Sequence, residues 1–456
     1  MKTDPITYVS TRGKSPALTF DDVLLDGLAP DGGLYVPAQW PVLERLPSGD
    51  YTDIAKAVMR PFVQGGVVGG ALDDLVETAY SRFRHPEVAP LAKVGEKRHL
   101  LELFWGPTLS FKDYALQLVG GMFELVLGTR GERVQVVGAT SGDTGSAAIE
   151  ALAGREGVDV VILFPLGRIS EIQRLQMTTV ADSNVLAVAV DGTFDDCQDL
   201  VKAAFGSEHL RKDLHLAAVN SINWARVMAQ AVYHTWSAVK VGEPITVSVP
   251  TGNFGNVFAA DVARRMGVPI EHFIVANNQN HGLSDLISTG RILLEEVIPT
   301  SSPAMDIQIS SNLERELFEL FDRDGTALTD FMARLRRDGG AVLDEVRLAA
   351  FQNRFEGHWY SDDRLAETIG RVYSESGMLI EPHTAAGWLA AEESGDERPV
   401  VSIATAHPAK FPEVVEAATG VAPELPAWLG DLKDRPERYE VIPPDLADLT
   451  ELLVSR

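Results

Sequence analysis

Lys112 stands in surroundings that favour a reactive amine. The string GPTLSFKDY at residues 106–114 places Lys112 in the first turn of a predicted helix, with Ser110 as the N-cap. A cation is disfavoured there because the helix dipole is positive at its N-terminus, and the apolar neighbours Leu109 and Phe111 also lower the pKa of an amine. A neutral amine is the form that makes a Schiff base with a carbonyl group. Lys112 is therefore the candidate nucleophile, although the same string also fits a solvated surface lysine.

Two turns rich in small residues each follow an apolar strand and open a helix. They read PTGNFGN at residues 250–256 and GATSGDTGS at residues 138–146. Small residues let the backbone approach a ligand, and the free amides of a helix start bind anions. Neither turn has the lysine of a nucleotide P-loop or the GxGxxG pattern of a dinucleotide site. Each could be an ordinary tight turn, but residues 250–256 also predict a cradle for a phosphate that is not part of ATP.

Two further polar segments follow predicted strands. Asn220, Ser221 and Arg226 lie between a strand and a long helix, and their side chains could together bind one anion. The string ATAHPAKF at residues 404–411 ends the last predicted strand, and its histidine and lysine invite a catalytic interpretation. Helix capping and structural roles are the alternatives for both segments.

All these segments occupy equivalent places in the predicted fold. From about residue 98, apolar strands alternate with helices, which predicts βαβ units and a doubly wound α/β protein with a largely parallel sheet covered on both faces. The predicted strands span residues 100–104, 134–138, 158–164, 185–190, 214–219, 245–249, 272–276 and 400–404. The predicted helices span residues 111–127, 143–153, 170–180 and 223–241. Because the carboxyl ends of parallel strands form one edge, where ligands bind, we expect the polar turns to converge there.

The two ends of the chain differ from this pattern. The first 95 residues or so are rich in turn signals, contain helical patterns at residues 53–64 and 71–84, and predict a small N-terminal domain. Residues from about 312 to 375 resemble a helical insertion. The tail from Pro423 onward is rich in proline and acidic residues, and we expect it to wrap over the surface.

Composition excludes several classes of function. Of 456 residues, 45% are hydrophobic and 23% charged, which is typical of a globular protein. The net charge of −25 argues against nucleic acid and anionic membranes as partners, so an anionic substrate needs local positive charge. Cys197 is the single cysteine and the ten histidines lack a ligand spacing, so we predict no disulfide and no metal site. Without a signal sequence or a long apolar run, a cytoplasmic protein is expected.

Taken together, the motifs resemble those of the threonine synthase family. The string GPTLSFKD around Lys112 is similar to the cofactor-lysine motif of that family. Further similar motifs, in the family's order, lie at residues 8–13, 31–37, 139–145, 220–226, 250–256, 310–315, 381–385 and 405–411. The resemblance runs from about residue 8 to about residue 420 and is strongest to the longer microbial and fungal form with an extra N-terminal domain.

The resemblance implies a fold-type II pyridoxal-phosphate enzyme, similar to the tryptophan synthase β chain. It implies an N-terminal domain at residues 1–95 and a large pyridoxal-phosphate-binding domain at residues 96–118 and 225–456. It also implies a smaller, mobile α/β domain at residues 119–224. A monomer or a homodimer is expected.

The implied reaction converts O-phospho-L-homoserine and water into L-threonine and phosphate. When the family's residue roles are transferred to the matching positions of this sequence, Lys112 is expected to carry pyridoxal 5'-phosphate covalently and later to move protons. Thr405 is expected to form a hydrogen bond with the pyridine nitrogen. The implied cofactor-binding residues are Lys112, Asp143, Gly252, Asn253, Phe254, Gly255, Asn256 and Thr405. The implied substrate-binding residues are Thr140, Ser141, Thr144, Asn220, Ser221 and Arg226. Asp143 would face the cofactor's 3'-oxygen, where asparagine is more usual.

Two other functions remain open at this point. A phospholyase or dehydratase of the same fold would eliminate phosphate and release a 2-keto acid. A protein of another class would bind pyridoxal phosphate as a non-catalytic regulator. Product analysis distinguishes the first alternative, and an absorbance change on adding substrate distinguishes the second.

Overall fold

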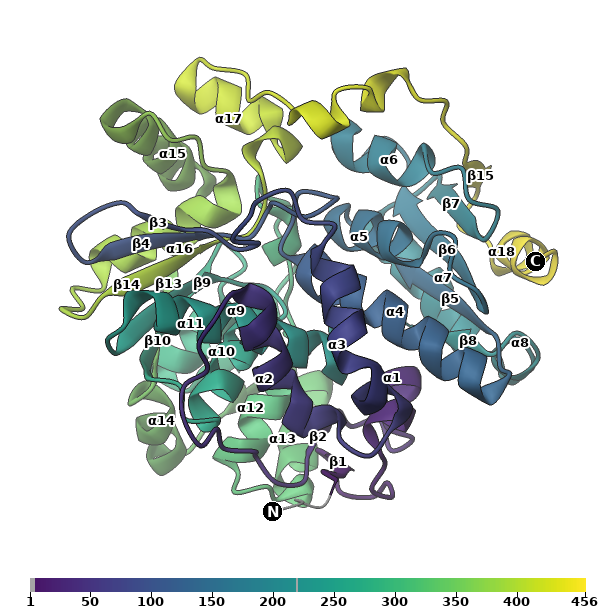
Figure 1. Ribbon diagram of the computed structural model, residues 1–456, viewed down its shortest axis with the longest axis horizontal. Helices are drawn as coiled ribbons and strands as arrows, with labels where there is room; N and C mark the ends of the chain where they lie inside the picture. The colour runs from purple at the N-terminus through teal and green to yellow at the C-terminus, as the bar shows by residue number, and fades with distance from the viewer. Residues whose placement is uncertain (1–4, 219) are drawn as a thin grey trace.

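Two large, mostly parallel sheets with helices on both faces form the centre of the molecule (Figure 1). The computed structural model describes residues 5–218 and 220–456. The larger sheet has the strand order β13 (Phe355–Trp359), β10 (Ile270–Asn277), β9 (Ile245–Pro250), β14 (Val400–Ala404), β4 (Arg98–Glu102) and β3 (Leu91–Lys93). Its neighbouring strands are parallel except β3, which is antiparallel to β4.

The smaller sheet is parallel throughout. Its order is β15 (Glu440–Ile442), β7 (Val185–Val190), β6 (Val158–Pro165), β5 (Val134–Ala139) and β8 (Leu216–Ala217). Alternate residues of its strands are buried on opposite faces: Val136 and Ile162 pack into one hydrophobic cluster, whereas Val137 and Leu163 pack into another. This two-sided burial explains the continuous apolar runs and confirms the predicted doubly wound α/β class.

Helices cover both faces of each sheet (Figure 1). On the larger sheet, α9 (Trp224–Val241) and α10 (Gly255–Arg265) lie on one side, and α15 (Asp362–Ser376) and α16 (Pro382–Glu393) lie on the other. On the smaller sheet, α4 (Lys112–Arg130), α5 (Asp143–Leu152) and α6 (Glu171–Thr178) lie opposite α7 (Phe194–Gly206) and α18 (Leu446–Val454). No helix within the described residues is both long and apolar enough to cross a membrane.

Local signals set the helix ends. Asn223 begins α9 by accepting a hydrogen bond from the amide of Ala225, and Ser170 begins α6 with a capping box to Gln173. Gly242 directly follows α9 and Gly131 directly follows α4, and both adopt the left-handed conformation that glycine adopts without steric cost.

The N-terminal segment packs directly on α4 and α9. It comprises β1 (Tyr8–Ser10), α1 (Phe20–Asp26), β2 (Tyr35–Pro37), α2 (Tyr51–Val63) and α3 (Val67–Tyr80). Its apolar side chains, such as Met59 and Phe62, belong to the same buried cluster as Trp224 of α9. The helix predicted to begin at residue 71 begins at Val67 instead, and residues 1–4 lie outside the described part of the chain.

The region from residue 312 to residue 375 is mostly helical but also contributes to the larger sheet. Besides α15, its helices are α12 (Leu313–Leu320), α13 (Gly325–Asp338) and α14 (Glu345–Gln352). Its strand β12 (Gly340–Val342) pairs with β11 (Arg291–Leu293), and β13 pairs in parallel with β10. The helical insertion expected at these residues therefore also contains strands. The sequence did not predict β13 because it is a half-exposed edge strand without the apolar run of a buried one.

Short elements complete the chain. They are α8 (Glu208–Asp213), α11 (Gly282–Thr289), α17 (Pro412–Thr419), and the 3₁₀ helices Pro303–Met305, Pro408–Lys410, Ala427–Leu429 and Leu432–Asp434. The strand predicted at residues 214–219 is the short strand β8, and Val219 lies outside the described residues.

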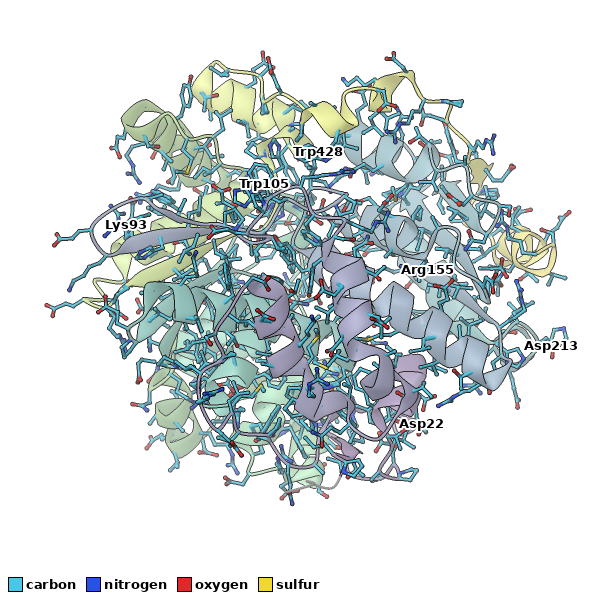
Figure 2. The ribbon with its side chains drawn as sticks, in the orientation of Figure 1. Asp22, Lys93, Trp105, Arg155, Asp213 and Trp428 are labelled. Atoms are coloured by element: carbon cyan, nitrogen blue, oxygen red, sulfur yellow. The ribbon has the colours of Figure 1, made fainter. Side chains whose placement is uncertain are left out.

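The C-terminal tail is part of the fold rather than only a surface wrap. From α17 it passes over the junction of the two sheets, where Trp428 lies beside Trp105 with ring centroids 6.2 Å apart (Figure 2). It then adds β15 to the edge of the smaller sheet and packs α18 on α7, burying Leu449 and Leu453. The three residues of β15 are too few to give a sequence signal, which explains why the strand was not predicted.

Leu453→Ala tests whether the tail stabilises the smaller sheet. Leu453 is fully buried, so we expect the free energy of unfolding to fall by about 2–5 kcal/mol. Urea denaturation measures this loss. The adjacent Val454, which is 60% exposed, provides the matched control, and Val454→Ala should leave stability nearly unchanged. Equal urea midpoints for the two variants would contradict the docking of α18.

Candidate active site

The candidate residues converge between the two sheets. Lys112 begins α4, Asp143 begins α5 and Gly255 begins α10, while Thr405 directly follows β14. Strands β9 and β14 are parallel neighbours, so the turns that follow them lie at the same edge. The turns after β9 and β14 therefore meet at one edge of the larger sheet, whereas Asp143 follows β5 of the smaller sheet.

Backbone hydrogen bonds fix the turn before Lys112 against the turn after β14. The amide of Phe111 donates to the carbonyl of Thr405 at 2.9 Å, and the amide of His407 donates to the carbonyl of Leu109 at 3.0 Å. Leu109 has a φ of 63°, in the left-handed region that a leucine rarely adopts. Such local strain persists where the surrounding structure holds it, and here it orients the start of α4.

The side chain of Lys112 is buried against a carboxylate. Its Nζ donates to Oδ2 of Asp143 at 3.2 Å and lies 4.8 Å from the ring centroid of Phe111. Burial lowers the pKa of Lys112 below the ordinary lysine value, although Asp143 acts in the opposite direction. The predicted Ser110 cap is wrong, because Phe111 occupies the N-cap position and the Ser110 hydroxyl has no hydrogen-bond partner among the described atoms.

Asp143 is shared by two lysines. Besides Lys112, it accepts a hydrogen bond from Nζ of Lys410 at 2.8 Å and one from Nε2 of Gln173 at 2.9 Å, both at Oδ1. Burial would raise the pKa of this carboxyl, but the two lysines outweigh burial and hold the pKa below its ordinary value. Asp143 is therefore an anion at neutral pH. Lys410 also donates to the carbonyl of Thr108 at 2.8 Å.

The turn after β9 presents the features of a phosphate cradle. Phe254 occupies the N-cap of α10 with a φ of 61°, and no side chain caps the helix. The first amides of α10 therefore remain available to an anion. Asn256 Oδ1 lies 2.8 Å from Nε2 of His234, whereas its buried Nδ2 has no hydrogen-bond partner among the described residues. A donor set of this kind fits the phosphate of pyridoxal 5'-phosphate.

A third segment supports this cradle. Ser310 donates to the carbonyl of Gly252, Ser311 donates to Oδ1 of Asn253 at 3.2 Å, and the amide of Asn312 donates to the carbonyl of Asn253 at 3.0 Å. In the sequence, residues 310–315 stand out only as a motif without a predicted role. A run of small polar residues directly before a helix was the available signal, but its partners could not be known.

The predicted anion-binding residues around Arg226 differ in their surroundings. Arg226 lies in the first turn of α9 with 2% of its surface exposed, and burial lowers its pKa to about 10, so it remains a cation at neutral pH. It lies near enough to Lys112 to lower the pKa of that amine. Ser221 is half-buried and its carbonyl accepts from Asn312, whereas the side chain of Asn220 is exposed and accepts from the amide of Ile222.

The turn after β5 holds the other predicted substrate residues. Thr140 is buried, and its hydroxyl accepts hydrogen bonds from the amides of Gly142 and Gly145 at 3.0 and 2.8 Å. Ser141 and Thr144 are half-buried on either side of Asp143. Thr140 therefore shapes the turn, while Ser141 and Thr144 retain side chains accessible to a ligand.

Thr405 lies against a buried carboxylate. Its hydroxyl donates to Oε1 of Glu381 at 3.4 Å, and Oε2 of that glutamate lies 2.6 Å from Nδ1 of His383. Burial raises the pKa of Glu381, but His383 and other hydrogen bonds outweigh burial and lower it overall. In the sequence, residues 381–385 form a motif that does not predict this contact. The described residues contain no group of three or more side chains placed to hold a metal ion.

The site can therefore perform amine chemistry beside two anion-binding regions. Lys112 supplies the amine, the start of α10 supplies open amide donors, and Arg226 supplies a positive charge in a chain whose net charge is −25. Burial strengthens each electrostatic interaction because little water is present to screen it.

Comparison with known proteins agrees with this chemistry. Residues 7–80 match the family model "Threonine synthase N terminus", residues 384–453 match "Threonine synthase, C-terminal", and residues 92–345 match "Pyridoxal-phosphate dependent enzyme". Threonine synthase from Pseudomonas aeruginosa is 48% identical to the chain over 451 residues, with 96% of each sequence covered.

Solved structures give the same result. The pyridoxal-phosphate-bound threonine synthase from Brucella melitensis superposes with a TM-score of 0.95 at 47% identity, with 98% of each chain covered. The threonine synthase from yeast superposes with a TM-score of 0.93 at 37% identity, with 99% of each chain covered. The chain therefore belongs to the threonine synthase family of pyridoxal-phosphate-dependent enzymes.

Proposed function

We propose that the chain converts O-phospho-L-homoserine and water into L-threonine and phosphate with the aid of pyridoxal 5'-phosphate. The observation that carries this proposal is the buried amine of Lys112 at the sheet edge that also holds the open start of α10. An amine with a lowered pKa suits a cofactor with an aldehyde, and the open amides suit its phosphate.

The proposed cofactor contacts follow from these features. Lys112 would bind the aldehyde carbon, and residues 252–256 would hold the phosphate with their open amides and with Asn256 Nδ2 as a further donor. The amide of Phe254 already donates to Oγ1 of Thr251 at 3.1 Å, so Phe254 shapes the cradle. Thr405 would contact the pyridine nitrogen, and Asp143 would face the 3'-oxygen. When bound, the pyridoxal ring accepts the electron pair that remains after a proton leaves the substrate.

In the proposed reaction, Lys112 moves the protons. Its Nζ takes the proton from the α carbon of the substrate, because the amine is released beside that atom. Arg226, Ser221 and Asn220 bind the substrate phosphate and stabilise the charge that it gains as it leaves the γ carbon. Loss of a β proton accompanies the departure of phosphate from the γ carbon. Water then adds its hydroxyl at the β carbon, and Lys112 returns protons to the γ and α carbons. Ser141 and Thr144 orient the amino-acid part of the substrate, and Thr140 keeps their turn in shape.

We further infer that residues 119–224 move relative to a large domain formed by residues 96–118 and 225–456, with residues 1–95 as an N-terminal domain. The smaller sheet supports treating residues 119–224 as one moving unit, because its strands β5–β8 lie within these residues. Strand β15 and α18 pack against the same unit. Motion of this unit would exclude water from the site.

The setting of the protein is also part of the proposal. The net charge of −25 supports a small-molecule substrate rather than nucleic acid. The single cysteine, Cys197, is buried, and burial raises its pKa to about 12, so the thiol is unreactive and suits a reducing cytoplasm. We expect a monomer or a homodimer.

Product analysis tests the function directly. The purified protein is incubated with pyridoxal 5'-phosphate and O-phospho-L-homoserine, and the products are identified. Threonine and phosphate in equal amounts support the proposal. A 2-keto acid with phosphate would instead identify a phospholyase or dehydratase, and the absence of any absorbance change would identify a non-catalytic binding protein.

Lys112→Ala should abolish the covalent link to the cofactor. We expect the wild-type protein to be yellow, and borohydride reduction followed by peptide mapping should locate the cofactor on Lys112. The variant should show no reduced adduct because it lacks the amine. Lys433→Ala is the control, because that lysine is exposed and paired with Glu171. An adduct on a lysine other than Lys112 would refute the assignment.

Arg226→Ala should lower kcat/KM for O-phospho-L-homoserine. Loss of a charge-assisted hydrogen bond costs about 1.5–3 kcal/mol, or roughly ten- to a hundredfold. Arg226→Lys should lose less, because it keeps the charge without the bidentate geometry. Steady-state kinetics measure both, and cofactor content should remain normal. If Arg226→Ala loses cofactor while its substrate affinity is unchanged, Arg226 binds the phosphate of the cofactor and not that of the substrate, and the two phosphate-site assignments must be exchanged.

A further inference from the structure

A second lysine lies beside the candidate nucleophile and has no role in the proposed reaction. Lys410 ends the 3₁₀ helix after β14, and its side chain is fully buried. Its Nζ donates to Oδ1 of Asp143 and to the carbonyl of Thr108, both at 2.8 Å. A buried ammonium needs such acceptors because removing it from water is costly. These two short contacts supply the acceptors that the buried amine of Lys410 needs.

Asp143 has two lysine neighbours but can balance only one positive charge. Among the described residues, Asp143 is the one hydrogen-bond acceptor of Lys112 Nζ, at 3.2 Å, whereas Lys410 has two acceptors at shorter distances. Two buried ammonium groups and one carboxylate leave a net positive charge, which surroundings of low dielectric disfavour. The lysine with fewer and longer contacts loses its proton more easily, and that lysine is Lys112.

The other charged or titratable groups near Lys112, Asp143 and Lys410 differ in their effect on the charge of Lys112. Arg226 adds a positive charge close to Lys112 and so also favours the neutral amine. Burial, together with Lys410, lowers the pKa of His407 to about 4, so this imidazole is neutral. Burial raises the pKa of Asp113, although the hydrogen bonds from the amide and hydroxyl of Thr108 and the nearby charge of Lys410 act in the opposite direction; no lysine donates a hydrogen bond to this carboxyl within the described residues. None of these groups replaces Asp143 as the anion that the two lysines share.

We propose that Lys410 is the fixed counter-ion of Asp143 and thereby leaves the amine of Lys112 neutral and able to react. The proposal rests on the proposed function, because it takes Lys112 as the residue that binds the cofactor. A carboxylate beside the nucleophile would hold Lys112 as an ion pair if no second cation satisfied it. Lys410 acts through Asp143 and is therefore a positioning residue.

Lys410→Met tests the proposal, because it removes the charge and nearly preserves the length of the side chain. Asp143 then has Lys112 as its counter-ion, and the pKa of Lys112 rises. The full-length chain is stripped of cofactor with hydroxylamine, and the rate of linkage to added pyridoxal 5'-phosphate is followed by absorbance across a series of pH values. The midpoint of this profile should rise by about one unit or more, so the rate near neutral pH should fall about tenfold or more.

A double variant separates charge from packing. Asp143→Asn combined with Lys410→Met removes the anion together with its counter-ion, so the midpoint should return to the wild-type value or below it. Lys433→Met is the matched control, because it removes the same formal charge from an exposed ion pair, and it should leave the midpoint unchanged. Circular dichroism establishes that each variant is folded.

The outcomes distinguish this inference from the proposed function. If Lys410→Met does not fold, Lys410→Gln removes the charge but keeps hydrogen-bond donors and gives the same measurement. An unchanged midpoint in either folded variant overturns the proposal, as does failure of the double variant to restore the midpoint. Unfolding of all three variants would show that Lys410 serves folding, and would also overturn it. Cofactor trapped on a lysine other than Lys112 would contradict the proposed function instead.

Discussion

The backbone contact between the turn before α4 and the turn after β14 is the constraint on which the site depends. It consists of two hydrogen bonds, from Phe111 to Thr405 and from His407 to Leu109. These two hydrogen bonds make neighbours of two turns that lie about 300 residues apart in the sequence. The start of α4 then has one orientation relative to the larger sheet, and Lys112 enters the buried space beside β14 instead of pointing into solvent.

The electrostatics of the site follow from that position. Once Lys112 is buried, its charged form needs an anion, and the start of α5 provides Asp143 at 3.2 Å. A buried carboxylate in turn needs cations and hydrogen-bond donors, which Lys410 and Gln173 provide. Each group is tolerated in the interior only because the next compensates it, so the site is an interdependent set rather than a collection of separate side chains.

The cradle at the start of α10 is held by a different set of contacts. The backbone of residues 252 and 253 is bound by residues 310–312, and Asn312 also binds the carbonyl of Ser221. Arg315, from the same segment, is fully buried and donates to the carbonyls of Tyr35 and Ile222. One short segment thus joins the N-terminal region, the loop before α9 and the cradle. It provides a physical route by which the packing of the N-terminal region supports the site.

The sequence by itself determined the features that depend on local pattern. Apolar runs predicted the interior strands because both of their faces are covered, and small residues after a strand predicted the turns around Asp143 and Gly255. The apolar setting of Lys112 predicted its lowered pKa. Only the tertiary structure decided that Lys410 shares Asp143 with Lys112, and that the short edge strands β13 and β15 extend the sheets. These features depend on hydrogen-bond partners distant along the chain, and such partners leave no periodic signal in the segments that they join.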